Sequence, residues 1–389
     1  MTWLFLLLIS ANSWAQTSVT EIKTPNEIKA LPPMEWAGDI RLRGNELRED
    51  VDDTRRYSQL RVRLGLKADI NSQSKAIVRL ASASSAISTN QTLGDSSAPG
   101  MVRRGFGLDL AYFDWKFHDF GHVWLGRTAN PFWAPNKVQT LFDADLSFEG
   151  VAFKWEPQWS ASGAFINGGA YIISENYVAP HDSVDVGLVG LDVGYKQKID
   201  DFTGTFHVGT YHYLNIKNCL ISCVETGGKV DPYSSPFERY RGNTVYAPDP
   251  VAPIDTRYFF KHQYTLFNAG LEGRLKLKGG AEVAPFVEYI KNYAIGGYND
   301  AQEYGINIKW HNWGGAVARI DKDMDSVVGA FTDSDSNGGG TDNEGYRFQL
   351  SYLLAKNTTM TVTQFEAKRA VDTVKHNFKW TQVDLSVSF

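Results

Sequence analysis

The sequence contains no apolar run that could cross a membrane as a helix. Such a helix needs about 20 consecutive apolar residues, and the run Trp3–Ile9 near the N-terminus is much shorter. A chain that spans a membrane without helices must form a closed β-barrel, because lipid cannot satisfy the backbone groups of an open sheet edge. The net charge of −5 is small and gives no indication of a nucleic-acid partner.

Cysteine is nearly absent, and proline avoids the regular parts of the chain. The two cysteines, Cys219 and Cys223, lie close together in a long polar segment without a third cysteine or a nearby histidine. This pattern favours a disulfide that closes a small loop over a metal site. Of the prolines, only Pro285 falls inside a segment with strand character, as expected because proline cannot donate to a strand ladder.

The chain does contain segments in which polar and apolar residues strictly alternate, and residues 59–70 show this most clearly. Its polar positions include Arg61, Arg63 and Lys67. Its apolar positions are Leu60, Val62, Leu64, Leu66, Ala68 and Ile70. Because strand side chains alternate between faces, this segment has one apolar and one charged face, which is typical of a strand between lipid and water.

The same pattern recurs along the chain and predicts an all-β fold, a transmembrane antiparallel β-barrel of about sixteen strands. The predicted strands are 34–47, 55–70, 74–86, 103–118, 121–128, 147–156, 159–173, 184–197, 201–214, 262–278, 280–294, 302–311, 313–331, 343–354, 358–370 and 374–389. Connections alternate between short turns and mostly longer loops, of which 215–261 is the longest. Short periplasmic turns and longer external loops are typical of outer-membrane barrels.

The two ends of the chain carry different signals. Residues 1–15 resemble a secretory signal peptide, with small residues at Ser13 and Ala15 for cleavage, although the usual N-terminal cation is missing. A buried N-terminal strand is the alternative. Residues 16–33 are polar and predict a flexible periplasmic lead-in to the barrel at 34–389. The last strand alternates up to the terminal Phe389, as in the C-terminal insertion signal of bacterial outer-membrane proteins.

Three further motifs resemble Gram-negative porins, most of all the group known as putative porins. They are Gly126-Arg127 with Asn130-Pro131-Phe132-Trp133, Leu146-Ser147-Phe148-Glu149-Gly150-Val151, and Asp333-Ser334-Asp335 with Gly338-Gly339-Gly340-Thr341-Asp342 and Glu344-Gly345. The resemblance covers essentially the whole mature chain. It implies a sixteen-stranded pore in the bacterial outer membrane, surrounded by outer-membrane lipid and commonly assembled as a homotrimer.

A pore constriction is expected where the third external loop, 129–146, folds into the channel. This loop carries Asp143 and Asp145, and the strands opposite carry a basic wall of Arg41, Arg43, Arg61, Arg63 and Arg79. An acidic loop facing a basic wall would create a transverse field that orients polar solutes. Arg127 is added to this set on the resemblance alone, because it shares parity with apolar Val123 and Leu125. The alternative is that the arginines coat a wide, unconstricted pore.

A calcium loop is a separate possibility, raised by the spacing of Asp333, Asp335, Asn337 and Glu344 around Gly338. Oxygen ligands at positions 1, 3, 5 and 12 with glycine at position 6 match the EF-hand loop. Against calcium, the flanking segments are predicted as strands, not helices. The alternative is a solvated hairpin tip. No other cofactor is expected.

The predicted function is a porin, a water-filled channel for passive diffusion of small hydrophilic solutes and ions, without catalysis. A substrate-selective porin is the nearest alternative. An outer-membrane adhesin or enzyme that uses loop 215–261 is a second alternative, although no acid–base constellation is evident. A soluble secreted all-β protein is a third.

Overall fold

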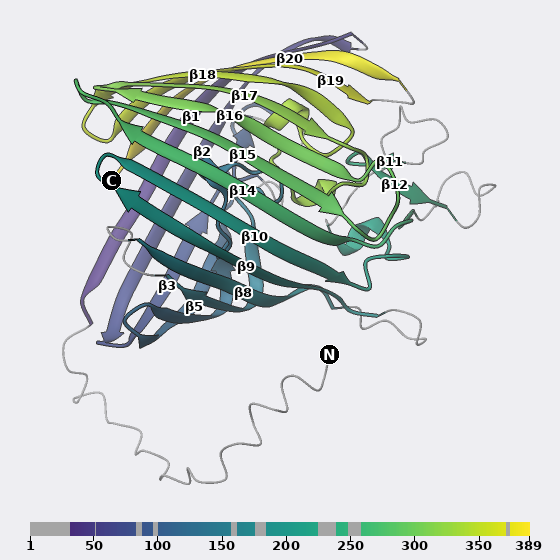
Figure 1. Ribbon diagram of the computed structural model, residues 1–389. Helices are drawn as coiled ribbons and strands as arrows, with labels where there is room; N and C mark the ends of the chain where they lie inside the picture. The colour runs from purple at the N-terminus through teal and green to yellow at the C-terminus, as the bar shows by residue number, and fades with distance from the viewer. Residues whose placement is uncertain are drawn as a thin grey trace. The chain divides into compact units, whose positions relative to one another are not determined.

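Sixteen long antiparallel strands form the wall of one closed barrel, as predicted (Figure 1). The computed structural model describes residues 32–50, 52–82, 88–95, 100–156, 162–175, 184–224, 239–247, 258–370 and 374–389. The predicted signal peptide and all but the end of the lead-in lie outside these residues. Within them, no helix is long and apolar enough to cross a membrane.

Each wall strand pairs with its neighbours in sequence. The wall strands are β1 (Met34–Glu49), β2 (Asp52–Asn71), β3 (Ser74–Ala81), β5 (Gly107–His118), β6 (Gly121–Ala129), β7 (Ser147–Trp155), β8 (Gly163–Ser174), β9 (Val186–Ile199), β10 (Phe202–Leu214), β14 (Thr265–Lys276), β15 (Ala281–Asn292), β16 (Asp300–Trp310), β17 (Trp313–Lys322), β18 (Asn343–Ala355), β19 (Thr358–Ala370) and β20 (Lys375–Ser388). A short strand, β4 (Gln91–Thr92), continues the wall beside β2 above the end of β3.

The first and last strands close the ring. β1 pairs with β2 on one side and with β20 on the other, from Asp39 opposite Ser388 to Glu49 opposite Phe378. The terminal Phe389 completes this seam, because its amide donates to the Gly38 carbonyl (3.0 Å) and its carbonyl accepts from the Gly38 amide (2.9 Å). Among the described residues, the wall of the barrel therefore has no open edge, which is the condition for crossing lipid.

Side chains alternate along the wall between an exposed apolar outer face and a polar or covered inner face. Leu64 on β2 and Leu350 on β18 are exposed, whereas the adjacent Arg63 lies largely covered inside. Exposed tryptophans such as Trp310 and Trp313 lie at the short-turn ends of their strands, where aromatic residues anchor barrels at a membrane interface.

Connections at one end of the barrel are short, and those at the other end are mostly long. The long ones include 82–106, 130–146, 215–264 and 323–342. They contain the short helices η2 (Pro135–Lys137), η3 (Ile221–Cys223), η4 (Gly329–Phe331) and η5 (Ser336–Gly338). Segment 215–264 also holds a small sheet, β11 (Arg239–Tyr240), β12 (Asn243–Tyr246) and β13 (Phe259–Phe260).

The predicted strand 313–331 was too long, because β17 ends at Lys322. β3 ends at Ala81, and residues 83–86 of the predicted strand 74–86 lie outside the described residues. After Lys322 the chain leaves the wall, and its apolar residues Val327, Val328 and Phe331 are buried in a core inside the barrel. An apolar run that packs into such a core has the same composition as an apolar strand, so the pattern alone did not distinguish them.

This inner core joins three of the long connections. Phe132 and Phe142 from loop 130–146 pack against Tyr211 of β10, and Phe331 from loop 323–342 stacks on Tyr213. Residues of segment 215–264 such as Ile216, Tyr240 and Phe260 belong to the same cluster. The sequence had predicted one loop inside the channel, whereas the structure packs residues of three long connections into one core.

Candidate functional site

Loop 130–146 is fixed along one side of the inner wall by hydrogen bonds to buried acidic side chains. The Trp133 amide donates to Asp192 on β9 (3.0 Å), and the Asn136 amide donates to Glu272 on β14 (2.6 Å). The Thr140 hydroxyl donates to Glu303 on β16 (2.8 Å). The loop therefore follows the wall across β9 to β16 and is not free to swing in the lumen.

Two buried ionisable side chains lie where loop 130–146 begins to follow the wall, and they pair with each other. Asp192 and His207 are fully covered, and Asp192 Oδ1 lies 2.6 Å from His207 Nδ1. The Trp133 ring packs edge-on against the His207 ring. Because a buried carboxylate is costly without partners, the amide of Trp133 and the imidazole of His207 together explain why Asp192 is tolerated here.

The far end of loop 130–146 reaches the predicted basic wall. Asp145 forms an ion pair with Arg63 on β2, and its other oxygen accepts from the amide and hydroxyl of Thr89 (both 2.9 Å). Asp145 and Arg63 were both predicted at the constriction, and the structure brings them together. They touch directly, so the charges do not face each other across open water as the transverse-field hypothesis required.

Asp143 turns away from the basic wall and joins the two inner loops. Its carboxylate accepts from the Ser334 amide (3.0 Å), its own amide donates to the Phe331 carbonyl (2.8 Å), and the Asp333 amide donates to the Gln139 carbonyl (3.1 Å). Burial, with Asp333 nearby, raises the pKa of Asp143 to about 8. Burial, with Asp335 nearby, raises the pKa of Asp333 to about 6.

Loop 323–342 also reaches the basic wall. Asp335 lies 2.5 Å from Arg43 of β1, which in addition bonds Asp384 of β20 through Nε (2.6 Å) and Nη2 (2.9 Å). Arg43 is nearly fully buried by these contacts. Thus Arg43 and Arg63, on adjacent strands, each receive one carboxylate from a different inner loop.

The remaining predicted arginines of the wall have smaller sets of partners. Arg61 pairs with Asp39 (2.6 Å), and Arg79 pairs with Asp109 (2.5 Å). Arg41 donates to the Asn90 side chain (2.6 Å). All three lie on the inner face of β1 to β3, where the sequence placed them.

Arg127 is not on this inner face, which corrects its inclusion in the constriction. In the strand pairing it lies opposite Ala111 and Glu149, two positions beyond Leu125, whose exposed side chain faces outward. Its guanidinium bonds the Glu149 carboxylate (2.5 Å) on the same outer face. The alternation of the strand outweighed the motif resemblance that had suggested an inward direction.

Three of the four residues of the calcium hypothesis are engaged by different parts of the protein, and the fourth, Asp333, accepts from the Asp335 amide within the loop (2.9 Å). Asp335 pairs with Arg43, Asn337 donates to Asn343, and Glu344 on β18 pairs with Arg319 (2.9 Å). Over the ranges that the structure describes, no group of three His, Cys, Asp or Glu side chains is arranged to hold a metal. Calcium binding stays a prediction, and it would require at least Arg43 and Arg319 to release their carboxylates.

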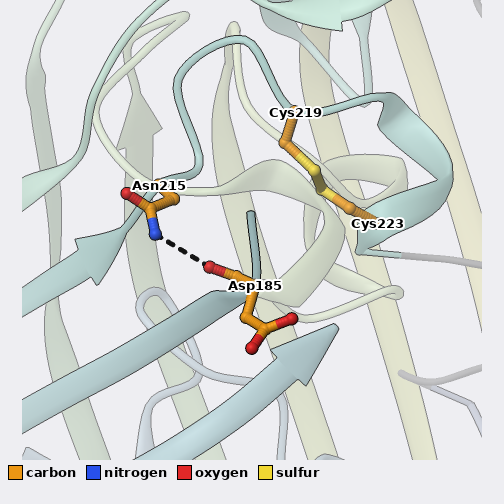
Figure 2. Close-up of a disulfide and its surroundings, with 4 residues drawn as sticks. All are labelled: Asp185, Asn215, Cys219 and Cys223. Carbon is orange, nitrogen blue, oxygen red and sulfur yellow. Dashed lines mark hydrogen bonds between the residues drawn. A yellow bond between two sulfur atoms is a disulfide. The ribbon is translucent and has the colours of Figure 1, made fainter. Parts of the chain in front are cut away.

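The structure joins Cys219 and Cys223 by a disulfide at the edge of the inner core (Figure 2). Nearby, the Asn215 side chain donates to the Asp185 carbonyl (2.9 Å), which links the start of segment 215–264 to the residue before β9. These contacts hold the beginning of the longest connection against the barrel mouth.

The comparisons with known proteins agree with this architecture. The model of a family described as "putative porin" matches residues 19–257 and 297–389. The chain belongs to the putative porin family. The family match therefore identifies a porin of the bacterial outer membrane, a channel through which small solutes and ions diffuse passively.

Solved porins share the fold at low sequence identity. A high-pH structure of Pseudomonas putida OprB matches with a TM-score of 0.57 and 12% identity, over 92% of this chain and 94% of that one. A structure of Salmonella typhi OmpF in complex with daunomycin matches with a TM-score of 0.51 and 10% identity, over 92% and 97% of the two chains. No curated protein sequence matches this porin.

Several site residues were missed by the sequence reasoning. Asp192, His207, Glu272 and Glu303 anchor the first inner loop, and Asp384 holds Arg43. The sequence did contain a signal that could have identified them, because each is an ionisable residue at an inward position of a wall strand. What the sequence did not contain was which loop would cover each of them.

Proposed function

We propose that loops 130–146 and 323–342 together form the constriction of this porin, and that solutes pass along the opposite side of the lumen. The supporting observation is a difference in exposure between two halves of the inner wall. Inward side chains of β8 to β10, such as Tyr171, Tyr211 and Asp192, are almost fully covered by the loops. Some inward side chains of β1, β2 and β18, such as Asp39, Arg61 and Gln349, keep partial or full exposure, although the loops cover Arg43 and Arg63 on the same strands.

This asymmetry gives the path a polar and charged lining, which suits small hydrophilic solutes and ions. Selectivity in such a path follows from its width and lining charge, as in other channels. We propose that the protein catalyses no reaction. The enzyme alternative would require an acid–base constellation in loop 215–261, of which the structure describes residues 215–224, 239–247 and 258–261.

Cysteine accessibility in a planar bilayer tests the position of the path. Gln349→Cys on the exposed half of the inner wall should react with a charged methanethiosulfonate reagent added to the water, and the single-channel current should fall. Val208→Cys, on the outer face of β10 and exposed there, is the matched control and should leave the current unchanged. Equal effects at both sites would contradict the proposed path.

We propose further that the porin works as a homotrimer, the assembly that the family resemblance implies. Native mass spectrometry of the detergent-extracted protein should give the mass of three chains. A monomer at all concentrations would contradict the trimer without affecting the channel.

A further inference from the structure

Arg41 and Arg61 lie side by side on the inner wall. They are directly opposite each other in the pairing of β1 with β2. Gln91 pairs with Leu60 on the other side of β2, so the preceding residue, Asn90, lies next to Arg61 in the same row. The Arg41 guanidinium extends along this row and donates from Nη2 to the Asn90 side-chain oxygen (2.6 Å).

Arg41 differs from the other arginines of the basic wall in forming no ion pair with a carboxylate among the described residues, although Asp384 and Asp335 act on it from farther away. Arg43 has Asp335 and Asp384, Arg61 has Asp39, Arg63 has Asp145 and Arg79 has Asp109. In the part of the chain that the structure describes, the polar side-chain contact of Arg41 is with the neutral amide of Asn90. Its Nε is buried and has no hydrogen-bond partner there.

This arrangement is unfavourable for the empty protein. Like charges directly opposite on neighbouring strands destabilise a sheet, and a buried guanidinium N–H without an acceptor adds the cost of its lost hydration. An oxyanion bound at Arg41 would offset the repulsion between the two guanidinium groups. The planar fork of a guanidinium matches carboxylate and phosphate oxygens, and such charge-assisted bonds are among the strongest in proteins.

We propose that Arg41 forms an anion subsite on the solute path, which takes the carboxylate or phosphate group of a small solute. Asn90 is a positioning residue, since its side-chain oxygen holds the guanidinium through Nη2. The proposal rests on the proposed path, because Arg41 lies on the half of the inner wall that the loops leave exposed. It goes beyond a general pore by predicting a preference for anionic over neutral solutes of similar size.

Three variants separate this subsite from a general effect of charge. Arg41→Gln removes the cation, and because it also removes the repulsion with Arg61 it should fold at least as well as the parent. Asn90→Asp leaves Arg41 in place and puts a carboxylate at hydrogen-bond distance from it. This carboxylate should pair with Arg41 and so compete with a solute anion for the subsite. Arg127→Gln removes the same charge from the outer face and is the matched control.

The readout is the single-channel chloride current in planar bilayers, titrated with inorganic phosphate in one series and with acetate in another. The parent and Arg127→Gln should show saturable competition by the anion. Arg41→Gln and Asn90→Asp should weaken that competition about fivefold or more, the effect of one unit charge in contact even at the dielectric of water. The two series show whether phosphate, carboxylate or both are accepted.

Uptake of a neutral sugar into liposomes should be the same for all four proteins, which reports an intact channel. Unchanged competition in Arg41→Gln or in Asn90→Asp, with conduction intact, would overturn the subsite and leave the porin function standing. Equal losses in Arg41→Gln and Arg127→Gln would overturn it too. Absence of any current or sugar uptake in the parent would instead overturn the proposed path, and the subsite with it.

Discussion

Asp335 reaches across 292 residues of sequence to place its carboxylate 2.5 Å from Arg43. The same guanidinium binds Asp384 on the last strand, so a single side chain connects the barrel seam to an inner loop. The seam of the wall and the position of the loop are therefore coupled through Arg43.

Loss of Asp384 should destabilise the barrel strongly. Asp384→Ala leaves Arg43 buried with one carboxylate fewer, and removing one partner of a buried ion pair costs about 3–5 kcal/mol. The temperature at which the folded band disappears on a detergent gel should fall. Glu366→Ala, which breaks an exposed outer-face pair with Lys379, should shift that temperature little, since surface pairs contribute about 0–1 kcal/mol. Equal shifts would refute the role of Arg43 at the seam.

Gly190 should be essential for the packing of the first inner loop. A Cβ at this position would lie 2.5 Å from the Phe132 ring and 2.8 Å from Tyr211, so Gly190→Ala must displace one of them. Overpacking of this kind typically costs about 1–3 kcal/mol. Protease cleavage within loop 130–146 should become faster and current noise should increase. Gly44→Ala, where a Cβ meets nothing within 4 Å, is the control and should behave as the parent.

The wall of the barrel could be predicted from sequence because its pattern is local. Because lipid lies on one side of the wall and water on the other, apolar and polar residues alternate along each strand. The outward direction of Leu64 and the inward direction of Arg63 can therefore be predicted without knowledge of any other strand. The loops inside the barrel are different. Asp145 was predicted at the constriction, but its contact with Arg63 and the turn of Asp143 toward Ser334 depend on pairings across the lumen, which no local pattern encodes.

Arg127 shows the limit of motif resemblance in the same way. The Gly-Arg motif indicated an inward residue, whereas strand parity indicated an outward one, and the pairing with Glu149 follows parity. Residues 327–331 show a limit of the apolar pattern itself. An apolar run has the same composition whether it faces lipid or packs in an inner core, so the sequence alone did not distinguish the two.

The contact between the two inner loops should be tighter in acid than in base. Burial raises the pKa of Asp143 to about 8 and that of Asp333 to about 6, so both carboxyls are favoured as neutral acids in the folded contact. Their contribution is fully present below about pH 4, the ordinary pKa of aspartate. It is lost as the pH rises through 6 and 8.

A spin label on the exposed Ala144 should report this change. The label should be immobile at pH 5 and mobile at pH 9, and Asp143→Asn, which keeps an oxygen acceptor but cannot ionise, should reduce the difference. A label with the same mobility at both pH values would contradict the assignment of the two carboxyls to this contact.

Calcium binding by residues 333–344 can be decided by calorimetry on the purified porin. If the loop binds calcium, heat should be released or absorbed below millimolar calcium, and Glu344→Gln should abolish it, because the bidentate ligand at position 12 would be lost. Arg319→Gln, which frees Glu344 from its pair, should then strengthen binding. No binding heat at millimolar calcium would end the hypothesis.

The alternation of the wall between water and hydrocarbon is tested most directly by spin labels at the neighbouring positions Gln349 and Leu350 of β18 in reconstituted vesicles. Gln349 lies on the inner face, and Leu350 is exposed on the outer face. The label at 349 should be relaxed by a water-soluble nickel reagent and the label at 350 by oxygen dissolved in the lipid. The same response at both positions would contradict a water-filled channel bounded by this wall.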